Sequence, residues 1–199
     1  MLSSLPAIQL ALYGLLSVCL VISLITDLQS RLIYNVVTYP TALLALLMRV
    51  GWTLHEGWTF GGPMTPEFAP ATGIVGLLVG FVPFLMMGMM RDGEAMGMGD
   101  AKLMGAVGAV VGFPGVLWAM LFTSLVGGIQ AILVLLWQGQ LLQVLLQALK
   151  RMAQFLKLRE MTEEEEATES PKVPYGVAIV VGTFWSLGWS LWNQAPTAG

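Results

Sequence analysis

Residues 97–115 of the chain read GMGDAKLMGAVGAVVGFPG, and this stretch shows how the whole sequence is organised. Its polar, glycine-rich opening carries Asp100 and Lys102, and no charged side chain follows from residue 103 to residue 149. A helix that spans a bilayer needs about 20 mostly apolar residues, so this run is too long for one span. Pro114, with a glycine on either side of the Phe-Pro pair, predicts a break. The stretch therefore predicts two membrane helices, with Asp100 at the N-terminal end of the first.

The composition of the full chain also indicates a membrane protein. Apolar residues make up 56% of the 199 residues and charged residues 11%, whereas soluble domains carry about 25% charged residues. This length predicts a single domain over residues 1–199. One cysteine, Cys19, and one histidine, His55, are too few for a typical zinc site or a Ser-His-Asp triad. We therefore expect no metal and no cofactor, and we expect no nucleic-acid partner.

Charge-free runs place the other helices. Residues 1–26 contain no charged side chain and lack the basic start of a cleaved signal peptide, so we expect a retained first helix. The same length criterion, applied to the whole chain, predicts an all-α polytopic membrane protein with about six segments, the fourth of them short. These segments lie near residues 5–28, 34–50, 71–90, 100–113, 115–137 and 174–193.

Basic residues are distributed unevenly around these segments. With the N-terminus outside, eight of the nine lysines and arginines fall on the cytoplasmic side, and Arg49 alone lies opposite. The same orientation brings Asp27 and Asp100 to the cytoplasmic face. The eight residues are Arg31, Arg91, Lys102, Lys150, Arg151, Lys157, Arg159 and Lys172.

Three connecting regions differ in composition. Residues 51–70 are rich in Gly, Pro and Trp and are expected to form an external loop. Residues 139–160 repeat leucines at helical spacing beside basic residues, which predicts an amphipathic helix on the inner membrane surface or an extension of the fifth segment. The acidic run over 160–169 is expected to be a solvated loop.

Two aspartates at the ends of apolar segments are the candidate functional residues, because membrane segments rarely keep an aspartate without a use for it. Gly97 and Gly99 are expected to let the backbone around Asp100 bend tightly or approach a substrate. As an alternative, Asp100 is a plain helix N-cap. Asp27 is poorly placed near the negative end of its helix, which favours a function over an i,i+4 pair with Arg31.

The segment after Asp100 carries two further features. Gly105, Gly108 and Gly112 are three or four positions apart, a spacing that lets membrane helices pack closely. Lys102 is expected to orient Asp100 or to attract an acidic group of a substrate. As an alternative, it is an interfacial lysine whose ammonium group simply extends toward water.

Three blocks in this order resemble the type IV prepilin peptidases, a family of membrane aspartyl proteases. The stretch from Asp27 to Asn35 resembles the first-aspartate block, including Ile33, with Tyr34 in place of the usual proline. Residues 97–103 resemble the second-aspartate block, Gly-x-Gly-Asp-x-Lys-Leu. Residues 172–176, Lys-Val-Pro-Tyr-Gly, resemble the block that opens the last helix. Without the paired-cysteine region of larger members, the chain is similar to short peptidase-only forms, such as those of tight-adherence pili.

The resemblance implies an aspartic endopeptidase of the bacterial inner membrane, which removes the leaders of prepilins or pseudopilins at the cytoplasmic face. Asp27 and Asp100 would be the catalytic residues, and no metal is implied. The residues that would support the motifs or bind substrate are Gly97, Gly99, Lys102, Arg31, Asn35, Pro174, Tyr175 and Gly176.

Two other classes of membrane protein also use such aspartates. A small transporter or ion-translocating protein would use Asp27 and Asp100 as an ion or proton site. Transporters usually show internal repeats and midplane sites, whereas this sequence shows no convincing repeat and places both aspartates near one face. Presenilin-type proteases share the Gly-x-Gly-Asp motif, but the blocks at Asp27 and at residues 172–176 fit the prepilin family better.

The orientation can be tested by labelling single cysteines from outside intact cells, after replacement of Cys19. We predict that Asp92→Cys and Glu165→Cys are protected because their loops face the cytoplasm. A cysteine within residues 51–70 is the positive control and should react. Ready labelling at position 92 or 165 would overturn the orientation.

Overall fold

The computed structural model describes residues 7–30, 32–59, 66–90, 97–139 and 175–194, together with positions 142, 144, 146 and 149. Every regular element in these ranges is a helix, which confirms the all-α prediction. Five helices are long and apolar enough to cross a membrane, as expected for a polytopic membrane protein. The elements are α1 (Ala7–Ser30), α2 (Asn35–Thr59), η2 (Pro66–Phe68), α3 (Pro70–Met90), α4 (Met98–Val111), α5 (Gly115–Trp137) and α7 (Tyr175–Gln194).

The helix boundaries follow the predicted segments with one clear difference. α2 continues to Thr59, although an external loop was expected from residue 51 onward. A single glycine such as Gly51 costs a helix only about 1 kcal/mol, and the sequence has no proline between residue 51 and Pro63. The loop prediction was therefore wrong for the first part of residues 51–70.

α4 is the segment that was expected to be short. It has 14 residues, which at 1.5 Å per residue cover about 21 Å, less than the roughly 30 Å of a bilayer core. It is accordingly not one of the five candidate spans. The predicted surface helix over 139–160 and the acidic run over 160–169 lie outside the described residues, apart from the few positions named above.

The predicted break between α4 and α5 is present. α4 ends at Val111, and its C-cap residue Gly112 has φ 78° and ψ 176°. A positive φ of this size favours glycine, because a Cβ atom would be strained there. Val116 donates its amide to the Gly112 carbonyl at 2.8 Å as α5 begins. Gly112 and Pro114 thus end one helix and allow the next to start.

The chain divides into two compact units. The first contains residues 1–127 and 174–199, and the second contains residues 128–173. The first unit holds α1 to α4, α7 and the first part of α5, and it contains both candidate aspartates. Whether residues 1–199 act as a single domain remains a prediction.

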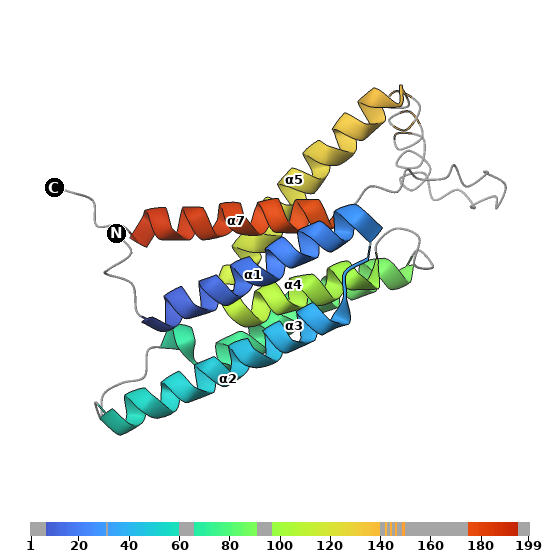
Figure 1. The fold of residues 1–199 in the computed structure, drawn as a ribbon. Helices are drawn as coiled ribbons and strands as arrows, with labels where there is room; N and C mark the ends of the chain where they lie inside the picture. Colours follow the sequence, from blue (N-terminus) through green and yellow to red (C-terminus); the bar gives the residue numbers. More distant parts are fainter. Residues whose placement is uncertain are drawn as a thin grey trace, which may run out of the picture. The chain divides into compact units, whose positions relative to one another are not determined.

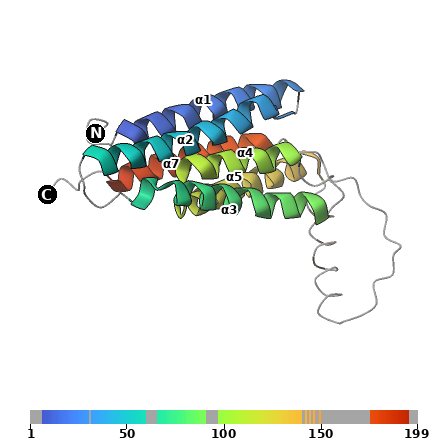
Figure 2. The same cartoon turned by 90° about the horizontal axis from the view of Figure 1, so that it is seen from below.

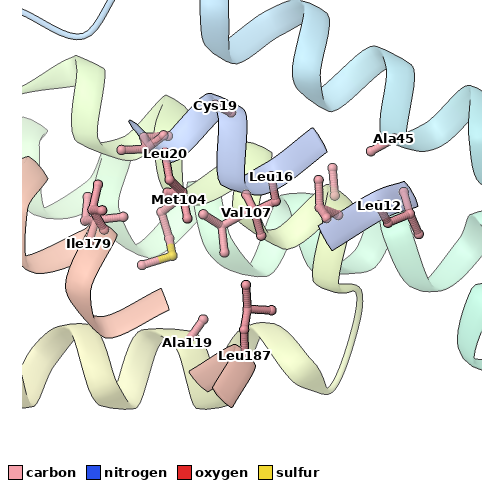
Figure 3. Packing of buried hydrophobic residues seen from close by; sticks show 14 of the residues in the cluster. Leu12, Leu16, Cys19, Leu20, Ala45, Met104, Val107, Ala119, Ile179 and Leu187 are labelled. Carbon is pink, nitrogen blue, oxygen red and sulfur yellow. The ribbon is translucent and has the colours of Figure 1, made fainter. Parts of the chain in front are cut away.

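Within the first unit, α4 is enclosed by other helices. Ten of its 14 residues are buried, and it contacts α1, α2, α3 and α7 (Figures 1 and 2). Apolar side chains from several helices meet around it (Figure 3), and a short helix is tolerated here because protein rather than lipid surrounds it. The core includes Leu12, Leu16, Leu20, Ala45, Met104, Val107, Ala119, Ile179 and Leu187.

The contact between α3 and α4 brings two backbones together. A Cβ atom added at Gly108 would overlap the carbonyl oxygen of Gly76, and one added at Gly76 would overlap that of Gly108. A Cβ atom at Gly80 would lie 2.5 Å from the carbonyl oxygen of Met104. The spacing of small residues along α4 therefore does predict close packing, and α3 supplies the matching glycines.

We predict that Gly108→Ala lowers the free energy of unfolding by about 1–3 kcal/mol, because the added methyl group meets backbone that cannot move aside. The matched control is Gly14→Ala in α1, where a Cβ atom meets nothing within 4 Å. That variant should be neutral or stabilised by up to about 1 kcal/mol through higher helix propensity. Thermal unfolding in detergent measures both, and equal midpoints would contradict the close contact.

Candidate active site

The two aspartates lie at the same end of the first unit. Asp27 is in the last turn of α1, and Asp100 is in the first turn of α4. The end of α1 and the starts of α2, α4 and α7 gather at this end of the bundle (Figure 1). Both side chains are buried, with 6% of Asp27 and 8% of Asp100 exposed, and the two carboxyl groups are near enough for a charge on one to affect the other. Two carboxylates that were predicted to pair are therefore within electrostatic range of each other.

The start of α4 differs from the sequence-based expectation. Its N-cap residue is Gly97, with φ −67° and ψ 141°, and Asp100 donates its amide to the Gly97 carbonyl at 3.0 Å. Asp100 is thus the third residue of the helix, so the alternative that made it the N-cap was wrong. Gly97 is extended and Gly99 is helical, conformations that any residue adopts. The expected tight bend at these glycines is absent.

Gly99 is instead required by a close contact within the protein. A Cβ atom added to it would lie 2.9 Å from the Cβ atom of Ile33, closer than real side chains approach. Ile33 belongs to the short connection between α1 and α2, directly after the helix that carries Asp27. The glycine therefore lets the first turn of α4 rest against this connection, which brings the two aspartate-bearing segments together.

The start of α7 lies near both aspartates. A Cβ atom added at Gly176 would lie 2.5 Å from Oδ2 of Asp27, so only glycine fits against this carboxylate. The half-buried side chain of Tyr175 lies within electrostatic range of Asp100. Its ring packs edge-on against Phe84 of α3, with 6.3 Å between centroids. The third sequence block is thus placed beside the first two.

Lys102 has partners that sequence analysis did not predict. Its ammonium group donates to Oδ1 of Asn35 at 2.9 Å and lies 5.4 Å from the centroid of the Tyr39 ring. The lysine therefore connects α4 to the start of α2, and its roles toward Asp100 and a substrate stay predictions. A cation over an aromatic face is attracted by the ring's electron density.

The substitution of Tyr34 for proline does not disturb the start of α2. The Tyr34 carbonyl accepts the amides of Val37 at 3.0 Å and Thr38 at 3.4 Å, and the helix begins at Asn35. Two other predicted residues, Arg31 and Pro174, lie outside the described residues.

Phe84 and Tyr39 were missed by sequence analysis. Phe84 packs on Tyr175, and the Tyr39 ring lies beneath the Lys102 ammonium group. Both residues are aromatic positions on apolar helices, among many similar ones, so the sequence carried no signal that singled them out. Among the residues that the structure describes, no group of three His, Cys, Asp or Glu side chains is placed to hold a metal ion.

Comparison with known proteins gives one match. The sequence profile of the type IV leader peptidase family matches residues 14–132, which is more than half of the chain. The matched range includes Asp27 and Asp100, whereas Tyr175 and Gly176 lie beyond it. Neither the curated proteins nor the solved structures give a match.

Proposed function

The chain belongs to the type IV leader peptidase family, and from this premise we propose that it is an aspartic endopeptidase acting on type IV prepilin-like proteins. The observation that carries the proposal is the pair of buried carboxylates, Asp27 and Asp100, within electrostatic range of each other. Each belongs to a different motif, and the two aspartates are 73 positions apart in the sequence. Family membership favours a peptidase over the ion-translocating alternative.

The chemistry proposed for this pair is general acid–base catalysis. Two like charges at close range in a buried place are not both ionised comfortably, so the pair holds one proton. The ionised carboxylate takes a proton from water, and the oxygen of that water attacks the scissile carbonyl carbon. The protonated carboxyl donates a hydrogen bond to the developing oxyanion. A proton is then delivered to the leaving amine, the C–N bond breaks, and the pair again holds one proton. The pair titrates as a unit, so the proposal assigns neither role to one particular aspartate.

The other residues of the site have supporting roles in this proposal. Gly176 leaves room for the Asp27 carboxylate, and Gly99 lets α4 approach the connection that follows Asp27. Lys102 and Asn35 hold the start of α4 against α2. Gly97 is the N-cap residue of α4, three positions before Asp100. Each of these contacts restricts where one of the two carboxylates lies.

The proposed substrate is a prepilin or pseudopilin, cut in front of its apolar helix. Large apolar side chains such as Leu43, Leu47 and Met86 are exposed on the helices of the first unit, where lipid or an apolar substrate helix would contact them. The positive-inside distribution supports a site at the cytoplasmic face of the inner membrane. The basic leader would then remain in the cytoplasm and the apolar helix in the membrane.

We predict that Asp27→Asn and Asp100→Asn each abolish leader removal, because an amide keeps the shape of the side chain but cannot accept and return a proton. Co-expression with a candidate prepilin, followed by gel shift of the trimmed product, measures this. The control is Glu164→Gln in the acidic run, which removes a carboxylate expected to be solvated and should cleave normally. Near wild-type cleavage by either asparagine variant, in correctly inserted protein, would refute the aspartic mechanism.

We also predict that Gly99→Ala inserts and folds but cleaves about ten to a hundred times more slowly. The methyl group must push Ile33 away, and a displacement of about 1 Å in an active site costs on the order of a hundredfold in rate. Met98→Leu is the neighbouring control, since 54% of the Met98 side chain is exposed. Equal rates for the two variants would show that the Gly99 contact does not place Asp100.

A further inference from the structure

Arg49 is a buried cation that the proposed reaction does not use. It lies in α2 with only 1% of its surface exposed, and it is the one basic residue on the external side of the predicted orientation. A charged side chain inside a membrane protein is costly unless its hydrogen-bonding groups find partners. The positions of those partners therefore indicate what the residue does.

One side of the guanidinium group binds the end of α4. Nε donates to the Ala109 carbonyl at 3.1 Å, and Nη2 donates to the Val110 carbonyl at 2.7 Å. Neither carbonyl has its usual helical donor. The amide of Phe113 donates to the Thr72 carbonyl at 3.0 Å instead, and Pro114, four residues after Val110, has no N–H. Arg49 thus supplies two donors that the end of α4 lacks.

The other side of the guanidinium group binds the chain that leads into α3. Nη1 donates to the carbonyls of Glu67 at 3.0 Å and Ala69 at 3.4 Å, and to Oγ1 of Thr72 at 3.1 Å. A single side chain from α2 therefore joins η2, the start of α3 and the end of α4. Its positive charge lies at the negative end of the α4 dipole, where a cation is stabilised.

Gly112 leaves the space that this arrangement needs. It has a positive φ of 78°, and a Cβ atom added there would lie 2.8 Å from Nη2 of Arg49. The chain thus turns away at the end of α4 and lets the guanidinium group reach the two carbonyls.

We propose that Arg49 is a positioning residue for the proposed cleavage reaction. It holds the far end of the same short helix whose first turn carries Asp100, about 14 Å away along the helix axis. The side chains around α4 are mostly apolar, and apolar contacts are non-directional. The planar guanidinium group donates to the two carbonyls in one fixed geometry, so it determines the axial position and the rotation of α4. It thereby sets where the Asp100 carboxylate lies relative to Asp27.

This inference rests on the proposed peptidase function, and steady-state kinetics on purified enzyme test it. We expect Arg49→Met to lower kcat by about ten- to a hundredfold and to change KM by less than about twofold, because Asp100 is displaced while no substrate contact is lost. The kcat of Arg49→Lys should fall between those of the wild type and Arg49→Met, since the lysine ammonium group replaces part of the hydrogen bonding but not the planar geometry. A wild-type kcat in folded Arg49→Met would overturn the inference.

A disulfide reports the position of α4 without any need for activity. Cysteines at positions 33 and 99, with Cys19 replaced by alanine, have Cβ atoms 2.9 Å apart before relaxation. The two segments must therefore separate slightly to reach the roughly 3.5–4.5 Å of a disulfide, and both the protein with Arg49 and the Arg49→Met variant require this same adjustment. We expect rapid oxidation with Arg49 present and a clearly lower rate with Arg49→Met. Equal rates would overturn the inference, even if the chain proved not to be a protease.

A second pair of variants remains informative if Arg49→Met does not fold. Gly112→Ala pushes a methyl group against Arg49, whereas Gly139→Ala has a similar φ of 68° and meets nothing within 4 Å. Both variants place an alanine at a positive φ, but only the methyl group of Gly112→Ala meets Arg49. Only Gly112→Ala should therefore lower kcat by about tenfold or more. Equal kcat values for the two variants would overturn the inference. If Asp27→Asn loses cleavage while Gly112→Ala keeps a normal kcat, the role of Arg49 is refuted and the proposed peptidase function is not.

Discussion

A helix inside a membrane protein must have its backbone groups satisfied at both ends, and α4 shows what this requires. The helix is short, ten of its 14 residues are buried, and the last carbonyls of any helix lack donors from within the helix. Pro114 removes one donor and the turn at Gly112 redirects another. Arg49 of α2 donates hydrogen bonds to both of the carbonyls left without a donor. Arg49 thereby joins α2, α3 and α4 through hydrogen bonds from one side chain.

Glycines in this protein mostly provide space rather than unusual backbone angles. Gly76 and Gly108 let two helices touch along their backbones, Gly99 admits Ile33, and Gly176 admits the Asp27 carboxylate. Gly112 is different, because it combines a positive φ with a close contact to Arg49. A methyl group at any of these positions would push apart elements that lie beside the candidate site or that hold α4.

The candidate site is assembled at the ends of helices that are far apart in the sequence. The last turn of α1 and the first turns of α4 and α7 meet there, so each contributes a polar group without interrupting the apolar middle of a helix. This placement would bury the proposed acid–base pair in protein and, in the predicted orientation, keep it close to one surface of the membrane. It also explains why short sequence motifs at helix ends identify most of the site.

The sequence by itself determined the apolar helices except for the longer end of α2, the break after Val111 and the two candidate aspartates. These features follow from local properties: apolar length, the missing N–H of Pro114, and the cost of a charge such as Asp27 or Asp100 in an apolar segment. Tertiary structure alone decided which groups meet. Lys102 binds Asn35 across 67 positions, and Arg49 binds carbonyls 60 and 61 positions away. Backbone carbonyls are the same at every residue, so no sequence pattern reveals which of them a buried cation will reach.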